Sequence, residues 1–165
     1  MVGTTGSGKT TFARELARQL GVPHIELDAI RHQAGWVELP DELFRERVSM
    51  ATTGDGWVVD GNYGRKLGDL VRRQADTVVW LDQPLPLALW RLWLRTVSRI
   101  VRQEELWNGN RESWRGGFWG RDSLFAWTLR SWVRHRREWP HKFAGDSRVV
   151  RLRSADEARR WLERQ

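Results

Sequence analysis

The sequence predicts an α/β fold with a mostly parallel sheet, and two observations carry this prediction. Short apolar runs that resemble strands alternate along the chain with longer amphipathic runs that resemble helices, as in parallel sheets with crossover helices. Close to the first residue lies a glycine-rich turn, residues 3–10, of the kind that joins a strand to a helix. The chain has 165 residues without an internal repeat or linker, so we expect one domain over residues 1–165.

The predicted elements follow one another in a regular order. We expect helices over residues 10–20, 41–53, 66–74, 86–103 and 124–138, and a last helix that begins after residue 154. We expect strands over residues 24–27, 57–59, 77–81 and 148–152. Gly21 ends the first helix and Asp41 is the expected N-cap of the second. Ser154 and Glu157 have the spacing of a capping box.

The glycine-rich turn fits the phosphate-binding pattern G-x-x-x-x-G-K-[ST] at every fixed position. Its backbone amides and the positive end of the next helix suit phosphate oxygens, which predicts a three-layer P-loop NTPase fold. We expect Lys9 to act as a catalytic cation on the β- and γ-phosphates of ATP, and Thr10 to bind Mg²⁺. The full set of expected nucleotide-binding residues is Gly3, Thr4, Thr5, Gly6, Ser7, Gly8, Lys9, Thr10 and Thr11.

The strand that should precede the P-loop is expected to be truncated. Only Met1 and Val2 stand before Gly3, whereas a P-loop normally follows a buried central strand. Either the first strand has been lost or the true start of the chain lies upstream. An inactive remnant of the fold is therefore one alternative, and a broad, non-cooperative thermal transition would favour it.

Three aspartates each end an apolar run: Asp28, Asp60 and Asp82. The carboxyl ends of parallel strands face the ligand crevice, so all three could open toward the P-loop. We expect Asp60 to act on Mg²⁺ through water, together with Thr10, because Mg²⁺ keeps several of its waters. Asp28 is the candidate for contact with the substrate, and a turn-forming role is the alternative for each aspartate.

The chain resembles adenylate-kinase-type P-loop small-molecule kinases, and among them the branch described as DNA topology modulation proteins. The resemblance covers nearly the whole chain and rests on the P-loop, on Asp-Gly-Asn-Tyr at 60–63 and on Leu-Trp-Asn-Gly-Asn-Arg-Glu at 106–112. It implies that Asp60 lies beside the Mg²⁺ waters and that Arg91 and Arg95 bind phosphate. Arg65 is the counterpart of an acceptor-binding arginine, although it is displaced by one residue. Asp28 falls where related kinases hold an acceptor hydroxyl.

Arginines give this chain its charge, and they gather in one region. Residues 91–137 contain eleven arginines and four acids, so this region alone accounts for the net charge of +7. Four arginines, Arg91, Arg95, Arg99 and Arg102, recur at helical spacing, which predicts an anion-binding face, with a solvated face as the alternative. We expect Trp93, Val97, Ile100 and Val101 to form the apolar face of the same helix. A second stripe consists of Arg130, Arg134 and Arg137.

Two segments complete the expected site. Residues 28–53 form the acceptor segment, and residues 104–122, rich in glycine and tryptophan, form a mobile lid that could close over a base. The four histidines show no metal-ligand spacing.

Composition narrows the classes of function. There is no cysteine, no apolar run long enough to span a membrane and no signal peptide, so we expect a cytoplasmic protein without a membrane partner. The sequence predicts a monomeric phosphotransferase that moves the γ-phosphoryl group of ATP to a nucleoside monophosphate or another small acceptor. The alternative is a regulatory nucleotide-binding protein that acts on DNA, with arginines on the phosphates and tryptophans on the bases.

Overall fold

Parallel strands form the centre of the computed structural model, which describes residues 1–165. The strands are β1 (Val2–Gly3), β2 (His24–Glu26), β3 (Val58–Asp60), β4 (Val78–Leu81) and β5 (Val149–Leu152). β1 pairs with β4 and β4 with β5, while β2 pairs with β3, all in parallel. The two groups meet where Gly61 N donates to Met1 O at 3.3 Å, so the order is β2-β3-β1-β4-β5. The P-loop therefore leaves the central strand, which is only two residues long.

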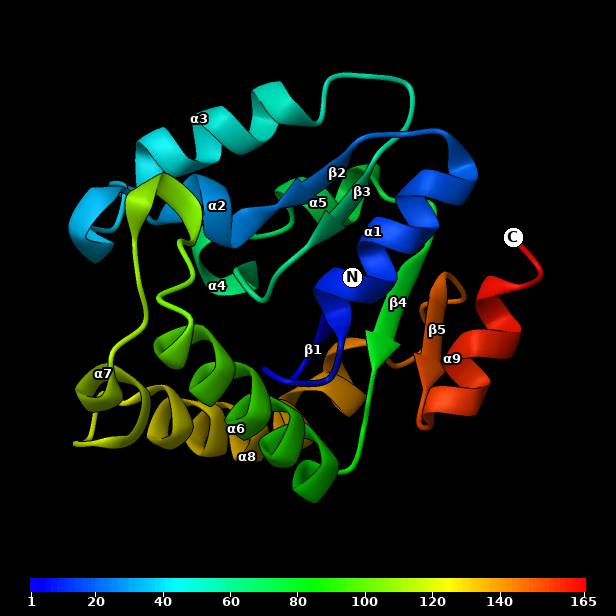
Figure 1. Ribbon diagram of the computed structural model, residues 1–165. Helices are drawn as coiled ribbons and strands as arrows, with labels where there is room; N and C mark the ends of the chain where they lie inside the picture. The colour runs from blue at the N-terminus through cyan, green and yellow to red at the C-terminus, as the bar shows by residue number, and fades with distance from the viewer.

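Helices cover both faces of the strands (Figure 1). α1 (Lys9–Leu20) and α9 (Ala155–Leu162) lie on one face, where Phe12 stacks on Trp161 with ring centroids 5.9 Å apart. α8 (Leu124–Lys142) lies on the other face, where Trp139 meets Trp80 of β4 edge to face at 5.6 Å. This three-layer α/β arrangement confirms the predicted fold class. No helix is both long enough and apolar enough to cross a membrane.

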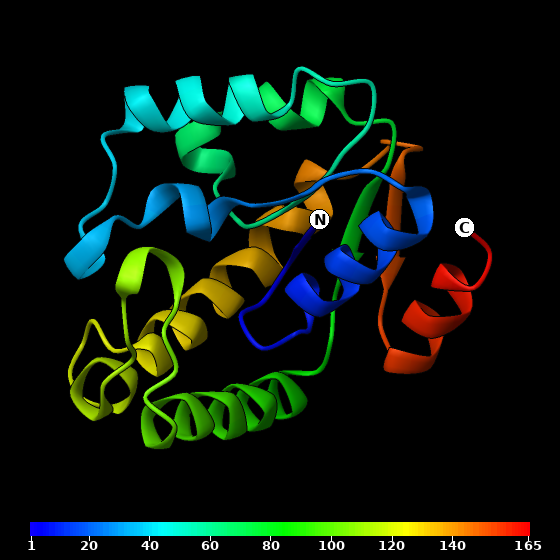
Figure 2. The ribbon, with the colours of Figure 1, turned by 45° about the horizontal axis from the view of Figure 1, so that its top comes forward.

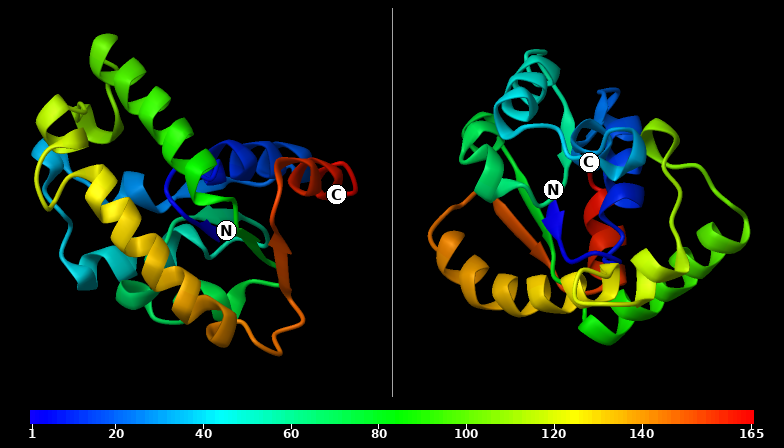
Figure 3. Two further views of the ribbon diagram at one scale, coloured as in Figure 1. Left: turned by 90° about the horizontal axis from the view of Figure 1, so that it is seen from below. Right: turned by 90° about the vertical axis from the view of Figure 1, so that its left-hand side faces the viewer.

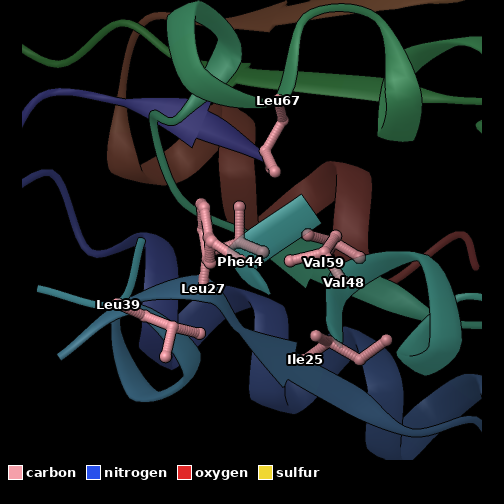
Figure 4. Packing of buried hydrophobic residues seen from close by; sticks show 7 residues of the cluster. All are labelled: Ile25, Leu27, Leu39, Phe44, Val48, Val59 and Leu67. Carbon is pink, nitrogen blue, oxygen red and sulfur yellow. The ribbon is translucent and has the colours of Figure 1, made fainter. Parts of the chain in front are cut away.

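In the predicted acceptor segment, residues 28–53, α3 (Asp41–Ala51) lies above β2 and β3, while α2 (Leu27–Arg31) continues from the end of β2 (Figure 2). The 3-10 turn η1 (Ala34–Trp36) lies between the two helices. One apolar cluster joins the segment to the strands, with Phe44 and Val48 fully buried. Figure 4 shows the members of this cluster, which are Ile25, Leu27, Leu39, Phe44, Val48, Val59 and Leu67.

α6 (Leu85–Val101) and α8 extend from the strands toward the lid (Figure 3). The lid contains the 3-10 turn η2 (Trp107–Gly109) and α7 (Trp114–Phe118). α7 connects the two long helices: a Cβ on Gly117 would lie 3.0 Å from Thr96 of α6, and Phe118 stacks on Phe125 of α8 at 5.0 Å.

Several predicted elements differ in detail. The helix expected over 66–74 is two helices, α4 (Gly64–Leu67) and α5 (Leu70–Gln74), because Gly68 between them adopts a φ of 59°. Asp41 is the first residue of α3 rather than its N-cap, and its side chain accepts a hydrogen bond from Arg31. α8 continues past Glu138 to Lys142 with Pro140 in its last turn.

The apolar face predicted for residues 86–103 is partly wrong. Ile100 is buried as expected, but Trp93 and Val101 are 42% and 68% exposed. The helix packs instead through Ala88, Leu92, Thr96 and Ile100.

Candidate active site

The P-loop has the geometry of a phosphate cradle. Gly6 and Gly8 adopt φ values of 83° and 92°, a conformation that glycine reaches without strain. Among the backbone amides of residues 4–12, only Ser7 N and Phe12 N donate to a backbone oxygen, of Thr4 and Gly8 respectively, so the amides of Lys9, Thr10 and Thr11 at the start of α1 have no protein acceptor. The buried hydroxyl of Ser7 also has no partner. These donors fit the oxygens of a triphosphate.

α6 is held directly against this loop. A Cβ built on Gly6 would lie 2.1 Å from the backbone oxygen of Ala88, so only glycine permits this approach. The contact presents two arginines of α6 to the P-loop. Arg91 Nη1 lies 3.8 Å from the Cβ position of Gly8, and Arg95 is half-buried with an Nε that has no partner. Burial, together with the neighbouring charge of Arg99, lowers the pKa of Arg95, which is the signature of a cation without a paired anion.

Lys9 is folded back onto the P-loop. Its Nζ donates to Gly3 O at 2.7 Å and to Thr4 O at 3.1 Å. Burial lowers the pKa of Lys9 to about 8, although the charges of Asp28 and Asp60 oppose the change. Asp28 and Asp60 therefore both favour the charged form of Lys9, the expected catalytic cation.

A hydroxyl and two carboxylates meet beside the P-loop. Glu26 and Asp60 end neighbouring strands and face each other in register, and the Thr10 hydroxyl lies 3.5 Å from Glu26 Oε1. Burial disfavours the charge on Asp60, but His24, 3.6 Å away, helps to keep the pKa of Asp60 below its usual value. Burial raises the pKa of Glu26, and the charge of Asp60 adds to this rise.

These groups fit Mg²⁺ held through water. No three histidine, cysteine or acidic side chains come close enough to hold a metal by themselves. Asp60 Oδ2 faces His24 Nε2 at 3.6 Å, and the Thr10 hydroxyl also helps to lower the pKa of Asp60, so the carboxylate beside Thr10 suits a contact with an ordered water of the ion. Thr10 and Asp60, the predicted pair, are thus brought together.

Asp28 lies next to this group on α2 and is held by aromatic side chains. Tyr63 donates its hydroxyl proton to Asp28 Oδ1 at 2.6 Å, and His32 Nε2 lies 3.4 Å from the same hydroxyl. The adjacent Asn62 holds the P-loop: its Nδ2 donates to Gly3 O at 2.6 Å and its Oδ1 accepts from Gly3 N at 3.2 Å. The Asp-Gly-Asn-Tyr stretch therefore ties Asp28 and the P-loop to β3.

The first half of the lid is docked on the acceptor segment. Asn108 Nδ2 donates to His32 O at 2.5 Å, and Asn110 Nδ2 donates to Gln33 O at 2.9 Å. The Trp107 ring stacks on His32 at 6.2 Å. Figure 1 shows this turn beside α2. Residues 106–112 thus form a clamp, and the predicted mobile lid is in contact with the acceptor segment along this half.

Other predicted residues lie apart from this centre. Arg65 pairs with Glu138 of α8 at 2.6 Å, with both side chains largely exposed. Asp82 is bound by Arg151 at 2.5 Å and by Arg136 at 3.5 Å, which agrees with a structural role. In the second arginine stripe, Arg130 lies 4.0 Å from Asp122 at the surface.

Three residues of the site had no predicted role: Glu26, and Asn62 and Tyr63, which counted only as members of the Asp-Gly-Asn-Tyr stretch. Glu26 and Asp60 are paired acids at the ends of two neighbouring strands, and this pairing could have identified Glu26. The predicted strand extended to Leu27, however, so Asp28 was taken as the acid at its end. For the asparagine and the tyrosine, the only signal was their place directly after Asp60-Gly61.

Comparisons with known proteins agree with this geometry. The sequence model of a family described as "AAA domain" matches residues 1–99. The shikimate kinase of Synechococcus elongatus is 27% identical over 138 residues, which cover 68% of this chain and 70% of that protein. The shikimate kinase of a Sulfurihydrogenibium species is 30% identical over 107 residues, 56% of this chain and 64% of that protein.

Two solved structures share the fold. A gluconokinase from Sinorhizobium meliloti 1021 has a TM-score of 0.54 at 18% identity and covers 99% of this chain and 89% of its own. A sugar kinase from a Janibacter species has a TM-score of 0.54 at 19% identity, with 98% of this chain and 87% of that chain covered. At this identity the likeness concerns the arrangement of helices and strands.

Proposed function

This chain belongs to the AAA domain family and is an ATP-dependent small-molecule kinase, and from that premise we propose that it phosphorylates a hydroxyl group of a small acceptor. The observation that carries the proposal is the place of Asp28, a carboxylate whose charge acts on Lys9 and on Arg95. A base beside the phosphate-binding cations is what a hydroxyl acceptor requires, whereas a phosphate acceptor needs none.

In the proposed reaction, the acceptor oxygen forms a bond to the γ-phosphorus of ATP. The bond from this phosphorus to the bridging oxygen breaks, and ADP leaves with the electron pair. Asp28 takes the proton of the acceptor hydroxyl. The P-loop amides, Lys9 and Arg95 neutralise the charge that spreads over the phosphoryl oxygens.

Thr10 and Asp60 are the residues that would hold Mg²⁺, with Glu26 fixing the Thr10 hydroxyl. Bound to ATP, the ion would neutralise charge on the β- and γ-phosphates. Arg91, which is exposed beside Gly8, would act from the other side of the P-loop.

The names of the relatives also favour a hydroxyl acceptor, since shikimate and gluconate are hydroxy acids. A nucleoside monophosphate remains the second candidate acceptor, and Arg65 would be expected to bind its phosphate. Against it stands the ion pair of Arg65 with Glu138.

The test is ADP release from Mg-ATP with a panel of polyols, hydroxy acids and nucleoside monophosphates. We expect release to require a hydroxyl acceptor, to vanish in Lys9→Ala and to fall at least about 100-fold in Asp28→Asn. The matched controls are Lys142→Ala and Asp55→Asn, which change exposed residues and should leave the rate unchanged. Release that depends on a nucleoside monophosphate and survives Asp28→Asn would refute the proposal.

ATP binding without release for any acceptor would instead favour the DNA-binding alternative. That function predicts DNA binding which falls steeply with salt and survives Lys9→Ala.

A further inference from the structure

The Asp-Gly-Asn-Tyr stretch brings the only tyrosine of the chain to the proposed base. The Tyr63 hydroxyl lies 2.6 Å from Asp28 Oδ1, and Oδ2 of the same carboxylate accepts no hydrogen bond from the protein. The tyrosine ring packs edge to face on fully buried Phe44 at 5.1 Å, which fixes the position of the hydroxyl.

The direction of this hydrogen bond is settled by its surroundings. Burial and the charge of Asp28 raise the pKa of Tyr63, so its hydroxyl keeps its proton and donates it. The oxygen can then accept from His32 Nε2 at 3.4 Å. With the proton of His32 on Nε2, both hydrogen bonds in this chain of three residues run toward the carboxylate.

His32 is itself held from the lid. Its carbonyl accepts from Asn108, and its ring contacts the indoles of Trp36 and Trp107 with centroids 5.6 and 6.2 Å away. The two indoles also contact each other, at 6.3 Å. The other charged groups around Asp28 are Lys9 on α1, Glu26 on β2, Asp60 on β3 and Arg95 on α6.

We propose that Tyr63 is a positioning residue for Asp28, supported by His32: it occupies one carboxylate oxygen and so directs the other toward the acceptor hydroxyl. This inference rests on the proposed function, because it takes Asp28 as the base. Tyr63 then affects the chemical step without touching ATP or the acceptor.

The first arm of the test is kinetic. Tyr63→Phe keeps the ring on Phe44 and removes only the hydroxyl, so we expect kcat to fall about 10- to 100-fold, the range for a hydrogen bond to a charged group. The KM values for ATP and acceptor should stay within about twofold. In an Asp28→Asn background the same change should have almost no further effect on kcat. His32→Leu should lower kcat less than Tyr63→Phe, and His32→Gln, which keeps a donor, should restore part of it.

The second arm needs no turnover. With one tyrosine in the chain, ¹³Cζ-labelled tyrosine gives a single NMR resonance. We expect Asp28→Asn to shift this resonance and Asp55→Asn to leave it in place.

The two failures are distinct. If wild-type protein phosphorylates no hydroxyl acceptor, the proposed function falls and this inference falls with it. Wild-type turnover with an unchanged kcat in Tyr63→Phe, additive effects in the double variant, or a resonance indifferent to Asp28→Asn would overturn the inference alone. A higher acceptor KM with unchanged kcat would also overturn it, because Tyr63 would then bind the acceptor itself.

Discussion

Substitutions of two glycines in the P-loop can test how closely α6 packs against this loop, through their effects on the free energy of unfolding. Gly6 and Gly8 both adopt positive φ, 83° and 92°, so alanine is strained at either position. Their surroundings differ. A Cβ on Gly6 would meet the Ala88 backbone oxygen at 2.1 Å and Leu92 Cβ at 3.2 Å, whereas a Cβ on Gly8 would meet only Arg91 Nη1 at 3.8 Å. Gly8→Ala is therefore a matched control for Gly6→Ala.

The expected magnitudes follow from this difference. Left-handed backbone costs an alanine about 1–2 kcal/mol at both positions. At Gly6 the new methyl group must also push α6 away by roughly 1 Å to reach an ordinary contact, and overpacking of this kind costs about 1–3 kcal/mol. We expect a loss of about 2–5 kcal/mol for Gly6→Ala and about 1–2 kcal/mol for Gly8→Ala.

The assay is urea unfolding of the two variants without nucleotide. With a slope of about 2 kcal/mol per M, the midpoint of Gly6→Ala should lie about 0.5–1.5 M below that of Gly8→Ala. The displacement of α6 carries Arg91 and Arg95 with it, so the KM for ATP should also rise more in Gly6→Ala. Equal midpoints, or a lower midpoint for Gly8→Ala, would refute the close packing of α6 on the P-loop.

Three further predictions concern ionisation and the asparagine that holds the P-loop. Burial lowers the pKa of Lys9 to about 8 and a bound triphosphate should raise it, so the protein should take up protons when it binds Mg-ATP at pH 9. Calorimetry in two buffers of different ionisation enthalpy would measure this uptake, and a binding heat that is the same in both buffers would contradict it. Burial and nearby cations lower the pKa of His135 to about 4. Between about pH 4 and 6.5 the unfolded state therefore binds more protons than the folded state, so the protein should become less stable as the pH is lowered through this window. In urea melts, the loss of unfolding free energy between pH 7 and pH 4.5 should be smaller in His135→Phe than in the wild-type protein by on the order of 2 kcal/mol. An equal loss in the variant and the wild-type protein would contradict this role of His135. Asn62→Ala should cost about 1–2 kcal/mol in a thermal melt, and Asn62→Asp more, because its carboxylate would face Gly3 O. An Asn62→Asp variant as stable as the wild-type protein would contradict the role of Asn62 in holding Gly3.

Sequence reasoning was sufficient where the signal is local. The P-loop is contiguous, and the alternation of apolar runs predicted the α/β fold class, which the structure confirms. The pairing of Thr10 with Asp60 followed from the rule that parallel strand ends share one edge. These predictions needed only the backbone geometry that each residue type prefers.

Sequence reasoning was insufficient where a partner comes from far along the chain. Asp82 resembled Asp60 as an acid after an apolar strand, yet Arg151, on the neighbouring strand β5, binds it. The clamp at Asn108 and Asn110 uses backbone carbonyls of α2 and the residues after it, and a carbonyl carries no sequence signal. Glu26 lies two positions before Asp28. The predicted strand ended at Leu27, one residue too late, so Asp28 rather than Glu26 was placed at the end of the strand.

The orientation of α6 shows why hydrophobic periodicity alone could not place its faces. The helix has apolar residues on more than one side, and the pattern favoured the side of Trp93 and Val101. The structure instead buries the side of Ala88, whose backbone oxygen comes so close to Gly6 that only glycine fits at position 6. Once Ala88 faces the P-loop, the helical repeat places Arg95 and Arg99 on the same side of the helix and turns Trp90 and Trp93 to the outside, where they stack at 5.3 Å. The tryptophans are exposed because close backbone packing at the P-loop, rather than the burial of apolar area, fixes the rotation of this helix.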